Sequence, residues 1–484
     1  MHLLDPDRHT RRAFLRRSAQ LAVAGTASPL AINLAALGEA AAATATDYKA
    51  LVCVFLFGGN DYANTVVPID SASHARYTAI RPTLATPLSQ LGATELRPAV
   101  ALSGGLKYAL APQMPELAAL FNSGKAAVQL NVGPLVLPMT RAQYSQGVLA
   151  QPPKLFSHND QQSVWQAQGA EGSTIGWGGR IGDLALNSNA SGASFTCIQI
   201  ASDDGFQGDA VFLTGNTALQ YQCTTQGAVP FEPTLQGSNY FFNDLSVNAA
   251  FADFITQPQR HVLAEKYTRV VRRSISSEIL VRSAINGAGM ATPFPSGNGL
   301  ADQLKVVAQL IAGRSALGAR RQVFMVSMGG FDTHDNMAGT HPNLLRKLSQ
   351  ALTAFHQATV DLGVSELVTT FTASDFGRTL SSNGDGTDHG WGGHQFIVGG
   401  AVKGKAFYGT PPPVSVGNGT GPEDQWHVGQ GRLLPSTSVD QYAATLAKWF
   451  GVADTELYGI LPNLDNFGSK AGRADYPEDL GFMA

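Results

Sequence analysis

Five short, almost uninterrupted apolar runs constrain the fold of this chain most. The first is Leu51-Val52-Cys53-Val54-Phe55-Leu56-Phe57, and similar runs lie at residues 126–132, 322–328, 367–372 and 395–398. A strand with one face in water alternates apolar and polar residues, whereas a continuous apolar run of this length predicts a strand that is buried on both faces. The runs therefore indicate a sheet that is covered on both sides.

Helical patterns lie between these runs, at residues 114–123, 300–317, 344–362 and 439–450. Strands that alternate with helices are typical of an α/β fold, in which helices cover both faces of a mostly parallel central sheet. Residues 225–300 have a weaker pattern and are richer in Gln, Asn and Ser. We expect that stretch to be an insertion or a cap.

The N-terminus carries the twin-arginine signature Thr10-Arg11-Arg12-Ala13-Phe14-Leu15-Arg16. A mostly apolar stretch follows, and then the small-residue run Ala40-Ala41-Ala42-Ala43, where a signal peptidase could cut. Residues 1–44 are therefore predicted to be a signal peptide for the twin-arginine (Tat) export machinery, and residues 45–484 the periplasmic or extracellular protein. An uncleaved anchor is the alternative, because about 20 apolar residues could span a bilayer. The glycines and the proline in the stretch make it only mildly hydrophobic, which favours a cleaved signal.

The charge balance argues against two classes of partner. The whole chain has a net charge of −3, and residues 1–45 hold five arginines against three carboxylates, so the remaining chain has a net charge of about −5. An acidic surface gives no electrostatic case for binding nucleic acid or an anionic membrane. After cleavage we expect no stable membrane span.

Three cysteines are too few for a fold built on disulfides, and they lack the close pairing of a zinc knuckle. Cys53 lies in the first apolar run and is interpreted as a small buried side chain. Cys197 and Cys223 could form a disulfide in an oxidising compartment or remain free thiols.

Polar residues gather where the predicted strands end, which is the edge of a parallel sheet that binds ligands. The run at 322–328 leads into Asp332 and His334, the run at 367–372 leads into Asp375, and His389 follows shortly after. Carboxylate oxygens and neutral imidazole nitrogens are ligands for divalent metals. The sequence thus predicts a metal site at this edge.

Other residues in these loops carry alternative interpretations. Asp61, after the first run, and His394 are further candidate metal ligands, whereas His341 precedes a proline and could simply lie at a helix start. Asp385 is interpreted as a turn or solvent residue, and Asp388 as a turn residue or a partner of a metal ligand.

Five motifs resemble the bacterial DUF1501 family, whose Tat-exported members are grouped with the alkaline phosphatase and sulfatase superfamily. The motifs are Phe57-Gly58-Gly59-Asn60-Asp61, Gly330-Phe331-Asp332-Thr333-His334, Ser374-Asp375-Phe376-Gly377-Arg378, Gly386-Thr387-Asp388-His389-Gly390 and Gly399-Gly400-Ala401-Val402-Lys403-Gly404. The resemblance implies an alkaline phosphatase-like α/β/α sandwich. It also implies one or two divalent ions (Zn, Mn, Mg or Ca) and a hydroxyl or thiol nucleophile that attacks a phosphate or sulfate ester.

The resemblance also implies roles for single residues. Asp61, Asp332, His334 and Asp375 match metal ligands of the superfamily, and His389 or His394 matches the last imidazole. Phe376 departs from the superfamily's Asp-His-Gly pattern, so one ligand is missing from its usual place. The position nearest the usual nucleophile is Leu137, and Thr140 is the nearest hydroxyl, although Ser157 and Thr333 are other candidates.

The substrate side of the site is less defined. Arg378 and Arg180 could clamp an oxyanion with paired N–H groups, or each could pair with a carboxylate. His158 could contact substrate or cap its own segment.

Two functions follow from these observations. The first is an exported, metal-dependent hydrolase of a phosphate or sulfate ester, acting on an anionic small molecule or polymer. The second is a non-catalytic secreted or cell-envelope protein that keeps the superfamily fold. The absent nucleophile favours the second, and the acidic and histidine loops favour the first.

Overall fold

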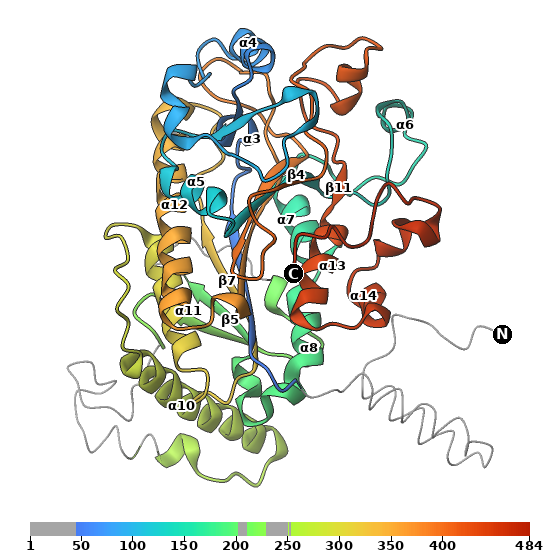
Figure 1. Ribbon diagram of the computed structural model, residues 1–484. Coiled ribbons are helices and arrows are strands. Elements are labelled where there is room, and N and C mark those ends of the chain that lie inside the picture. The colour runs from blue at the N-terminus through green and yellow to red at the C-terminus, as the bar shows by residue number, and fades with distance from the viewer. Residues whose placement is uncertain (1–44, 202–210, 229–249, 251–252) are drawn as a thin grey trace, which may run out of the picture.

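The computed structural model describes residues 45–201, 211–228, 250 and 253–484 (Figure 1). The predicted signal peptide at 1–44 lies outside the described residues, as does part of the predicted insertion at 225–300. No helix in the described ranges is long and apolar enough to cross a membrane.

A nine-stranded sheet forms the centre of the molecule, in the order β10-β4-β9-β8-β1-β7-β5-β6, with β11 also paired to β4. All strand pairs in this sheet are parallel except those of β9, which runs antiparallel to β4 and β8. The strands are β1 (Lys49–Leu56), β4 (Ala126–Gly133), β5 (Cys197–Ala201), β6 (Gln220–Thr224), β7 (Arg321–Met328), β8 (Val368–Ser374), β9 (Gly393–Gly399), β10 (Phe407–Tyr408) and β11 (Thr437–Ser438). The predicted mostly parallel sheet is confirmed, and all five apolar runs lie in it.

Helices cover both faces of the sheet. Side chains of β1 alternate between two cores, so that Val52 and Val54 pack on one side and Cys53 and Phe55 on the other. The first side is covered by α5 (Pro115–Asn122), α10 (Val262–Gly287), α11 (Gly299–Ala312) and α12 (Met337–Asp361). The second is covered by α7 (His158–Ala167), α8 (Trp177–Asn189), α13 (Val439–Phe450) and α14 (Asp454–Ile460) (Figure 1). The α/β/α sandwich is thus confirmed.

Short elements complete the fold near the end of β1. The helix α3 (Tyr62–Thr65) follows β1 directly, and β2 (Val66–Pro68) pairs with β3 (Tyr108–Leu110) in a separate two-stranded sheet. The helices α4 (Ser71–Ile80) and α6 (Arg141–Gln146) lie in the connections that follow β2 and β4.

The two cysteines that could have formed a disulfide are free. They lie on neighbouring parallel strands, but Cys197 is level with Gln220 and Cys223 with Ile200, an offset of three positions. An odd offset places two side chains on opposite faces of a sheet. Cys197 accordingly packs in one core and Cys223 in the other, so the disulfide alternative is wrong.

The pairing register of β1 positions the predicted site. Leu56 is level with Met328 of β7 and with Ser374 of β8, so the three strands end together. The loops that carry Asp332 and Asp375 therefore start side by side. Because β9 is antiparallel, its first residues lie at the same edge, and the preceding loop delivers His389 there.

Candidate metal centre

Three side chains, one from the start of α7 and two from loops, converge at this edge of the sheet. One ligand atom from each of His158, Asp332 and His389 lies within 4.8 Å of the other two. His158 Nε2 is 3.5 Å from Asp332 Oδ2, and His389 Nε2 is 3.2 Å from Asp332 Oδ1. Two imidazoles and one carboxylate form a donor set that suits a divalent metal such as zinc.

The imidazole of His389 is fixed from behind. Its Nδ1 lies 2.7 Å from the carbonyl oxygen of Phe156, so Nδ1 carries the proton and donates it. Burial holds the pKa of His389 below its usual value, which keeps the ring neutral. The Nε2 lone pair therefore faces Asp332 Oδ1, and two acceptors 3.2 Å apart need a proton or a cation between them.

His158 is held in the same way by a buried carboxylate. Its Nδ1 lies 2.6 Å from Asp375 Oδ2, which also accepts hydrogen bonds from Gln162 Nε2 at 2.9 Å and from the Gly58 amide at 3.1 Å. The hydrogen bond with Asp375 raises the pKa of His158. Asp375 thus orients His158 through Oδ2, an arrangement common behind metal-bound histidines. Its buried Oδ1 has no hydrogen-bond partner among the described residues, and Asp375 is not one of the three grouped candidate ligands.

Asp332 is anchored by Arg378. Burial alone would raise the pKa of Asp332, but the 2.8 Å hydrogen bond from Arg378 Nη1 and the positive charge hold it below its usual value. The carboxylate is therefore ionised. It remains partly exposed, with 43% of the side-chain surface accessible, so that ligands can reach the cluster from solvent.

His334 stands beside the three candidate ligands. Its Nε2 is 2.8 Å from His389 Nε2 and 3.1 Å from Asp332 Oδ1, while its Nδ1 is 3.3 Å from Asp388 Oδ1. Two nitrogens on one tetrahedral zinc ion lie about 3.3 Å apart. The two Nε2 atoms are closer than that, and His334 is not among the three residues whose ligand atoms group together. His334 is therefore a neighbour of the candidate site rather than a fourth ligand.

Phe376 occupies the position where the superfamily pattern has a histidine. Its ring centroid lies 4.9 Å from that of His158 and 4.7 Å from that of His389. The ring supplies no ligand atom, but it supports both imidazoles. Where the superfamily pattern has a histidine ligand, this chain therefore has a phenylalanine that packs against two candidate ligands.

Asp61 is not placed to bind a metal. Its two carboxylate oxygens accept hydrogen bonds from Arg81 Nη1 and Nη2 at 2.7 and 2.8 Å, and both side chains are fully buried. Asp61 Oδ1 also accepts the Asn64 amide at the start of α3. The prediction for Asp61 is corrected: the residue forms an ion pair and caps a helix.

His394 also lies apart from the cluster. It is the second residue of β9, its Nδ1 accepts the Asn131 amide at 3.1 Å, and its ring packs on Tyr62. Burial lowers its pKa to about 4. His394 is therefore a neutral core histidine, and the prediction that it binds a metal is corrected. Of the two histidines that could match the last imidazole of the superfamily, His389 is the one that lies in the cluster.

Neither predicted catalytic residue takes the expected role. The Thr140 hydroxyl is the N-cap of α6 and accepts the Gln143 amide. Arg378 is fully buried, and its donors reach Asp332, the Gly58 carbonyl, and the hydroxyl and carbonyl oxygens of Thr387. Thr140 is thus a helix cap, and Arg378 positions Asp332 instead of clamping substrate.

His158 was the residue that the sequence identified least clearly. It lies at the first position of α7, far along the chain from the glycine-rich loops, and its neighbours resemble no metal motif. The available signal was a histidine followed by acidic and amide side chains directly after a proline-rich turn. Only the packing of α7 against β8 brings it to the cluster.

No curated protein is similar in sequence to the chain. Solved structures similar to it include the lipoteichoic acid synthase LtaP from Listeria monocytogenes, with 9% identity over 77% of this chain and 68% of that chain and a TM-score of 0.29. Ps i-CgsB shares 9% identity over 87% and 77% of the two chains, with a TM-score of 0.34. The C-terminal periplasmic domain of EcEptC from Escherichia coli shares 10% identity over 87% and 88%, with a TM-score of 0.29.

At TM-scores this low, these likenesses carry no argument about the fold or the activity, and the α/β/α sandwich rests on the strands and helices themselves. The family comparison is informative. The model described as "Protein of unknown function (DUF1501)" matches residues 236–455, which include four of the five motifs. This match confirms the resemblance for residues 236–455, a little under half of the chain.

Proposed function

We propose that this chain is an exported, metal-dependent hydrolase of a phosphate or sulfate ester, with its centre at His158, Asp332 and His389. The observation that carries the proposal is the convergence of their ligand atoms within 4.8 Å. Both imidazoles are oriented from behind, by Asp375 and by the Phe156 carbonyl. Pre-oriented ligands of this kind are typical of metal sites.

One ion is proposed rather than two. Asp61 and His394, which a second ion would need from the predicted ligand list, are an ion-paired cap and a core histidine. A divalent ion held by the three ligands supplies Lewis acidity, which polarises an ester oxygen and lowers the pKa of water. Three protein ligands leave a coordination position open, as in catalytic zinc sites.

His334 and Asp388 are assigned to proton transfer. Asp388 Oδ1 faces His334 Nδ1, which leaves Nε2 directed at the cluster. An imidazole oriented by a carboxylate is suited to take a proton from water and return it to the leaving group. Water that this pair deprotonates would be the nucleophile in place of a side-chain hydroxyl, since Thr140 caps α6, Ser157 donates to Asp160 and the Thr333 side chain is buried.

Arg432 is assigned to the anionic part of the substrate. Its Nε donates to the carbonyl oxygen of His389 at 2.8 Å, and its guanidinium lies over the Phe156 ring at 5.2 Å. The charge of the Asp388 carboxylate acts on Arg432, but the two side chains form no direct ion pair in the part of the chain that the structure describes. These contacts fix the Arg432 guanidinium beside the cluster, where it is partly exposed. It is therefore placed to bind a substrate oxyanion, the role first predicted for Arg378.

Turnover of chromogenic esters tests the proposal. Purified protein is assayed with p-nitrophenyl phosphate, bis-p-nitrophenyl phosphate and p-nitrophenyl sulfate in the presence of Zn²⁺, Mn²⁺, Mg²⁺ or Ca²⁺. We expect hydrolysis of at least one ester, its loss in His158→Ala and His334→Gln, and a higher KM in Arg432→Gln. His261→Gln, on the exposed start of α10, is the control and keeps wild-type rates.

A binding protein without turnover is the second candidate. It is favoured by the absence of Thr140 and Ser157 hydroxyls from the cluster. Bound metal together with no hydrolysis of any ester in the panel would support this candidate and reject the enzyme.

A further inference from the structure

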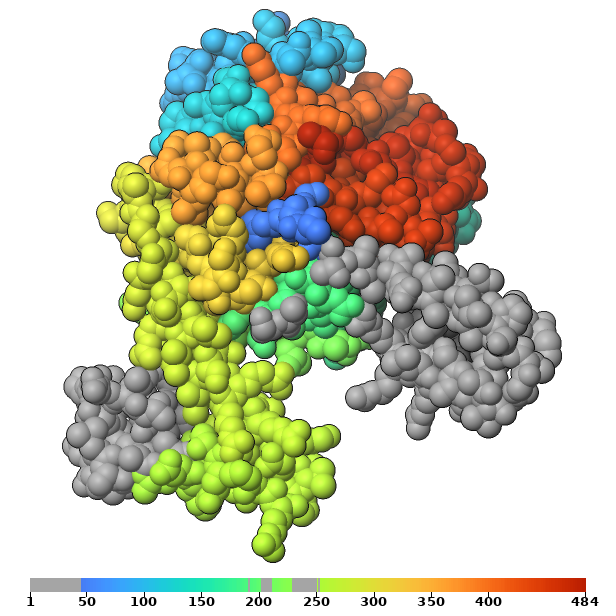
Figure 2. Space-filling view, turned by 60° about the horizontal axis from the view of Figure 1, so that its bottom comes forward, coloured from blue at the N-terminus to red at the C-terminus, as the bar shows by residue number. Residues whose placement is uncertain are grey.

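The first half of α10 presents apolar side chains to solvent. Val262 and Leu263 are each 69% exposed, Tyr267 is 64% exposed and Val270 is 51% exposed. Leu263, Tyr267 and Val270 are spaced i, i+4 and i+7, so they lie on one face of the helix. In Figure 2 the yellow-green segment that includes α10 extends away from the rest of the molecule. Apolar residues gathered on one exposed face are typical of an interaction surface.

The same stripe of α10 packs on the protein further along the helix. Val281 follows Val270 by 11 residues, which is close to three full turns, so the two side chains lie on the same face. Val281 and Ala284 are buried in the core on one side of the sheet. The second half of the stripe is thus covered by the body of the protein, whereas the first half carries it beyond that core.

Cationic side chains line the neighbouring face of the exposed half. Lys266, Arg269 and Arg273 are spaced i, i+3 and i+7, and all three are exposed. From 3.6 residues per turn, this row lies roughly 90° around the helix axis from the apolar row. The exposed side of α10 therefore combines an apolar row with a cationic row.

The charge of α10 is opposite to that of the whole chain. The helix holds five lysine and arginine side chains against two glutamates, whereas the chain has a net charge of −3. Each glutamate is paired within the helix, Glu265 with Arg269 at 2.9 Å and Glu278 with an arginine at 3.2 Å. Lys266 and Arg273 form no ion pair with any residue that the structure describes. The acidic net charge therefore does not describe this surface.

These two rows select among the partners that could cover the helix. A second copy of the chain would bring the same cations against each other, and like charges repel. An anionic lipid surface satisfies both rows at once. Apolar side chains of an amphipathic helix enter the boundary between headgroups and acyl chains, while lysine and arginine lie at the lipid phosphates.

We infer that the first half of α10 docks this protein on the surface of an anionic phospholipid membrane. The contact is peripheral and lies along the surface. In Figure 1, α10 lies at the bottom of the molecule, whereas α3, which follows β1 beside the metal centre, lies near the top. Docking through α10 therefore leaves the metal centre uncovered.

Cosedimentation of the purified full chain with lipid vesicles tests the inference. We expect binding to vesicles of phosphatidylglycerol and phosphatidylcholine, and little binding to phosphatidylcholine alone. Lys266→Gln/Arg273→Gln weakens this binding about 10-fold or more. Arg76→Gln/Lys305→Gln removes two exposed cations from other helices and is the matched control, which keeps wild-type binding. Circular dichroism checks that each variant is folded.

A fluorophore on α10 reports the contact directly. Because the three native cysteines are buried, Leu263→Cys can be labelled there with an environment-sensitive dye. We expect its emission to shift to shorter wavelength with the anionic vesicles and to stay unchanged with the neutral ones.

Three results would overturn the inference. They are equal binding of wild type and Lys266→Gln/Arg273→Gln, vesicle binding without a shift of the dye at residue 263, and binding of polyglutamate without binding of vesicles. The last result would assign α10 to an acidic protein partner.

Discussion

The ion pair of Asp61 and Arg81, near the loops of the candidate metal centre, has both side chains fully buried. Arg81 also donates to the carbonyl oxygens of Leu380 and Thr379, so it ties the end of β1 to the loop after β8. Removing one partner of such a pair leaves an unpaired charge in the interior, which is much more costly than losing a surface contact.

We therefore predict that Arg81→Ala lowers the free energy of unfolding by about 3–5 kcal/mol. Chemical denaturation followed by circular dichroism measures the change. The control Arg76→Ala, on the exposed side of α4, is expected to change stability by less than about 0.5 kcal/mol. Equal effects of the two substitutions would show that the pair does not contribute in this way.

Two buried histidines predict how stability depends on pH. Burial lowers the pKa values of His341 and His394 to about 4, whereas an unfolded histidine titrates near pH 6.5. Between these values the unfolded chain binds protons that the folded chain does not. Stability is therefore complete above about pH 6.5 and is lost as the pH falls toward 4.

Each histidine is expected to account for about 2 kcal/mol of the stability lost between pH 7 and pH 5. Denaturation of wild type and His394→Gln at both pH values measures the contribution of one residue. The variant should lose less stability than wild type over this interval. An identical loss in both proteins would mean that His394 binds a proton in the folded state as readily as in the unfolded state.

At the scale of elements, the loop after β1 depends on glycines because other loops cross it closely. Gly59 has φ +86, and a Cβ there would lie 2.5 Å from the Phe376 ring, which supports His158 and His389. A side chain at this position would displace Phe376 and, with it, both candidate ligands. Gly59 thus leaves room for the Phe376 ring, which packs against the two candidate histidine ligands.

Gly59→Ala is predicted to weaken metal binding about 10-fold or more, since supporting residues of metal ligands have effects of this size. Gly105→Ala is the matched control, because Gly105 has φ +71 but no atom within 4 Å of its Cβ position. The control should lose about 1 kcal/mol of stability and keep its metal affinity. Unchanged metal affinity in Gly59→Ala would show that the Phe376 contact has no such role.

Local patterns predicted elements better than they predicted contacts. The apolar run at 51–57 matches β1, and the pattern at 439–450 matches α13. The helix predicted at 344–362 begins earlier, at Met337, and includes Pro342 in its first turns, so His341 lies inside α12. Pro342 is the sixth residue of α12, beyond the first four amides that need no intrahelical partner, so it removes one hydrogen bond of the helix.

The contacts that the sequence could not give are those between distant segments. Asp332 and His389 follow predicted strands, and a parallel sheet brings such residues to one edge. Asp61 follows a strand as well, but nothing local shows that Arg81 takes both of its oxygens. His158 reaches the cluster only because α7 packs on the sheet, a contact without a local signature.

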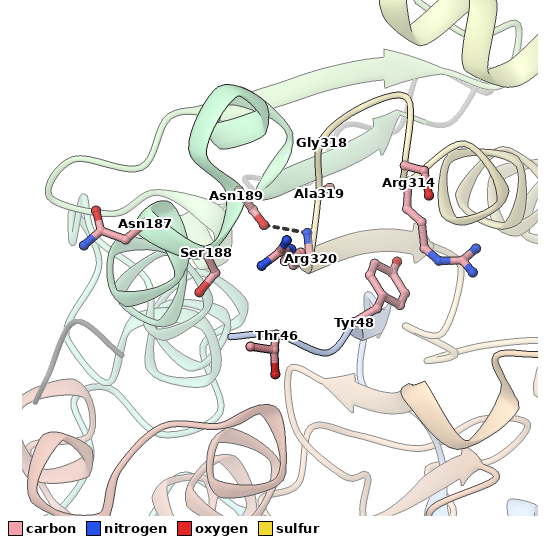
Figure 3. Close-up of a pocket in the computed structure, with 10 residues that line it drawn as sticks. Thr46, Tyr48, Asn187, Ser188, Asn189, Arg314, Gly318, Ala319 and Arg320 are labelled. Atoms are coloured by element: carbon pink, nitrogen blue, oxygen red, sulfur yellow. Dashed lines mark hydrogen bonds between the residues drawn. The ribbon is translucent and has the colours of Figure 1, made fainter. Parts of the chain in front are cut away.

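At the scale of the whole molecule, the candidate metal centre and a cavity lined by Arg314 and Arg320 (Figure 3) lie at opposite ends of the strands. The acidic and imidazole loops lie where β1, β7 and β8 end together, and the arginine-lined cavity lies where β1 and β7 begin. The described part of α10, on the side of the molecule shown in Figure 2, carries exposed apolar residues such as Leu263 and Tyr267.

The central claim is that His158, Asp332 and His389 hold one divalent ion. Elemental analysis of the purified protein, after equilibration with each candidate metal and removal of excess, tests it most directly. We predict one equivalent of metal in wild type and in His394→Gln, and about none in Asp332→Ala, with all three proteins folded by circular dichroism. A metal-free wild type, or metal retained by Asp332→Ala, would contradict the account.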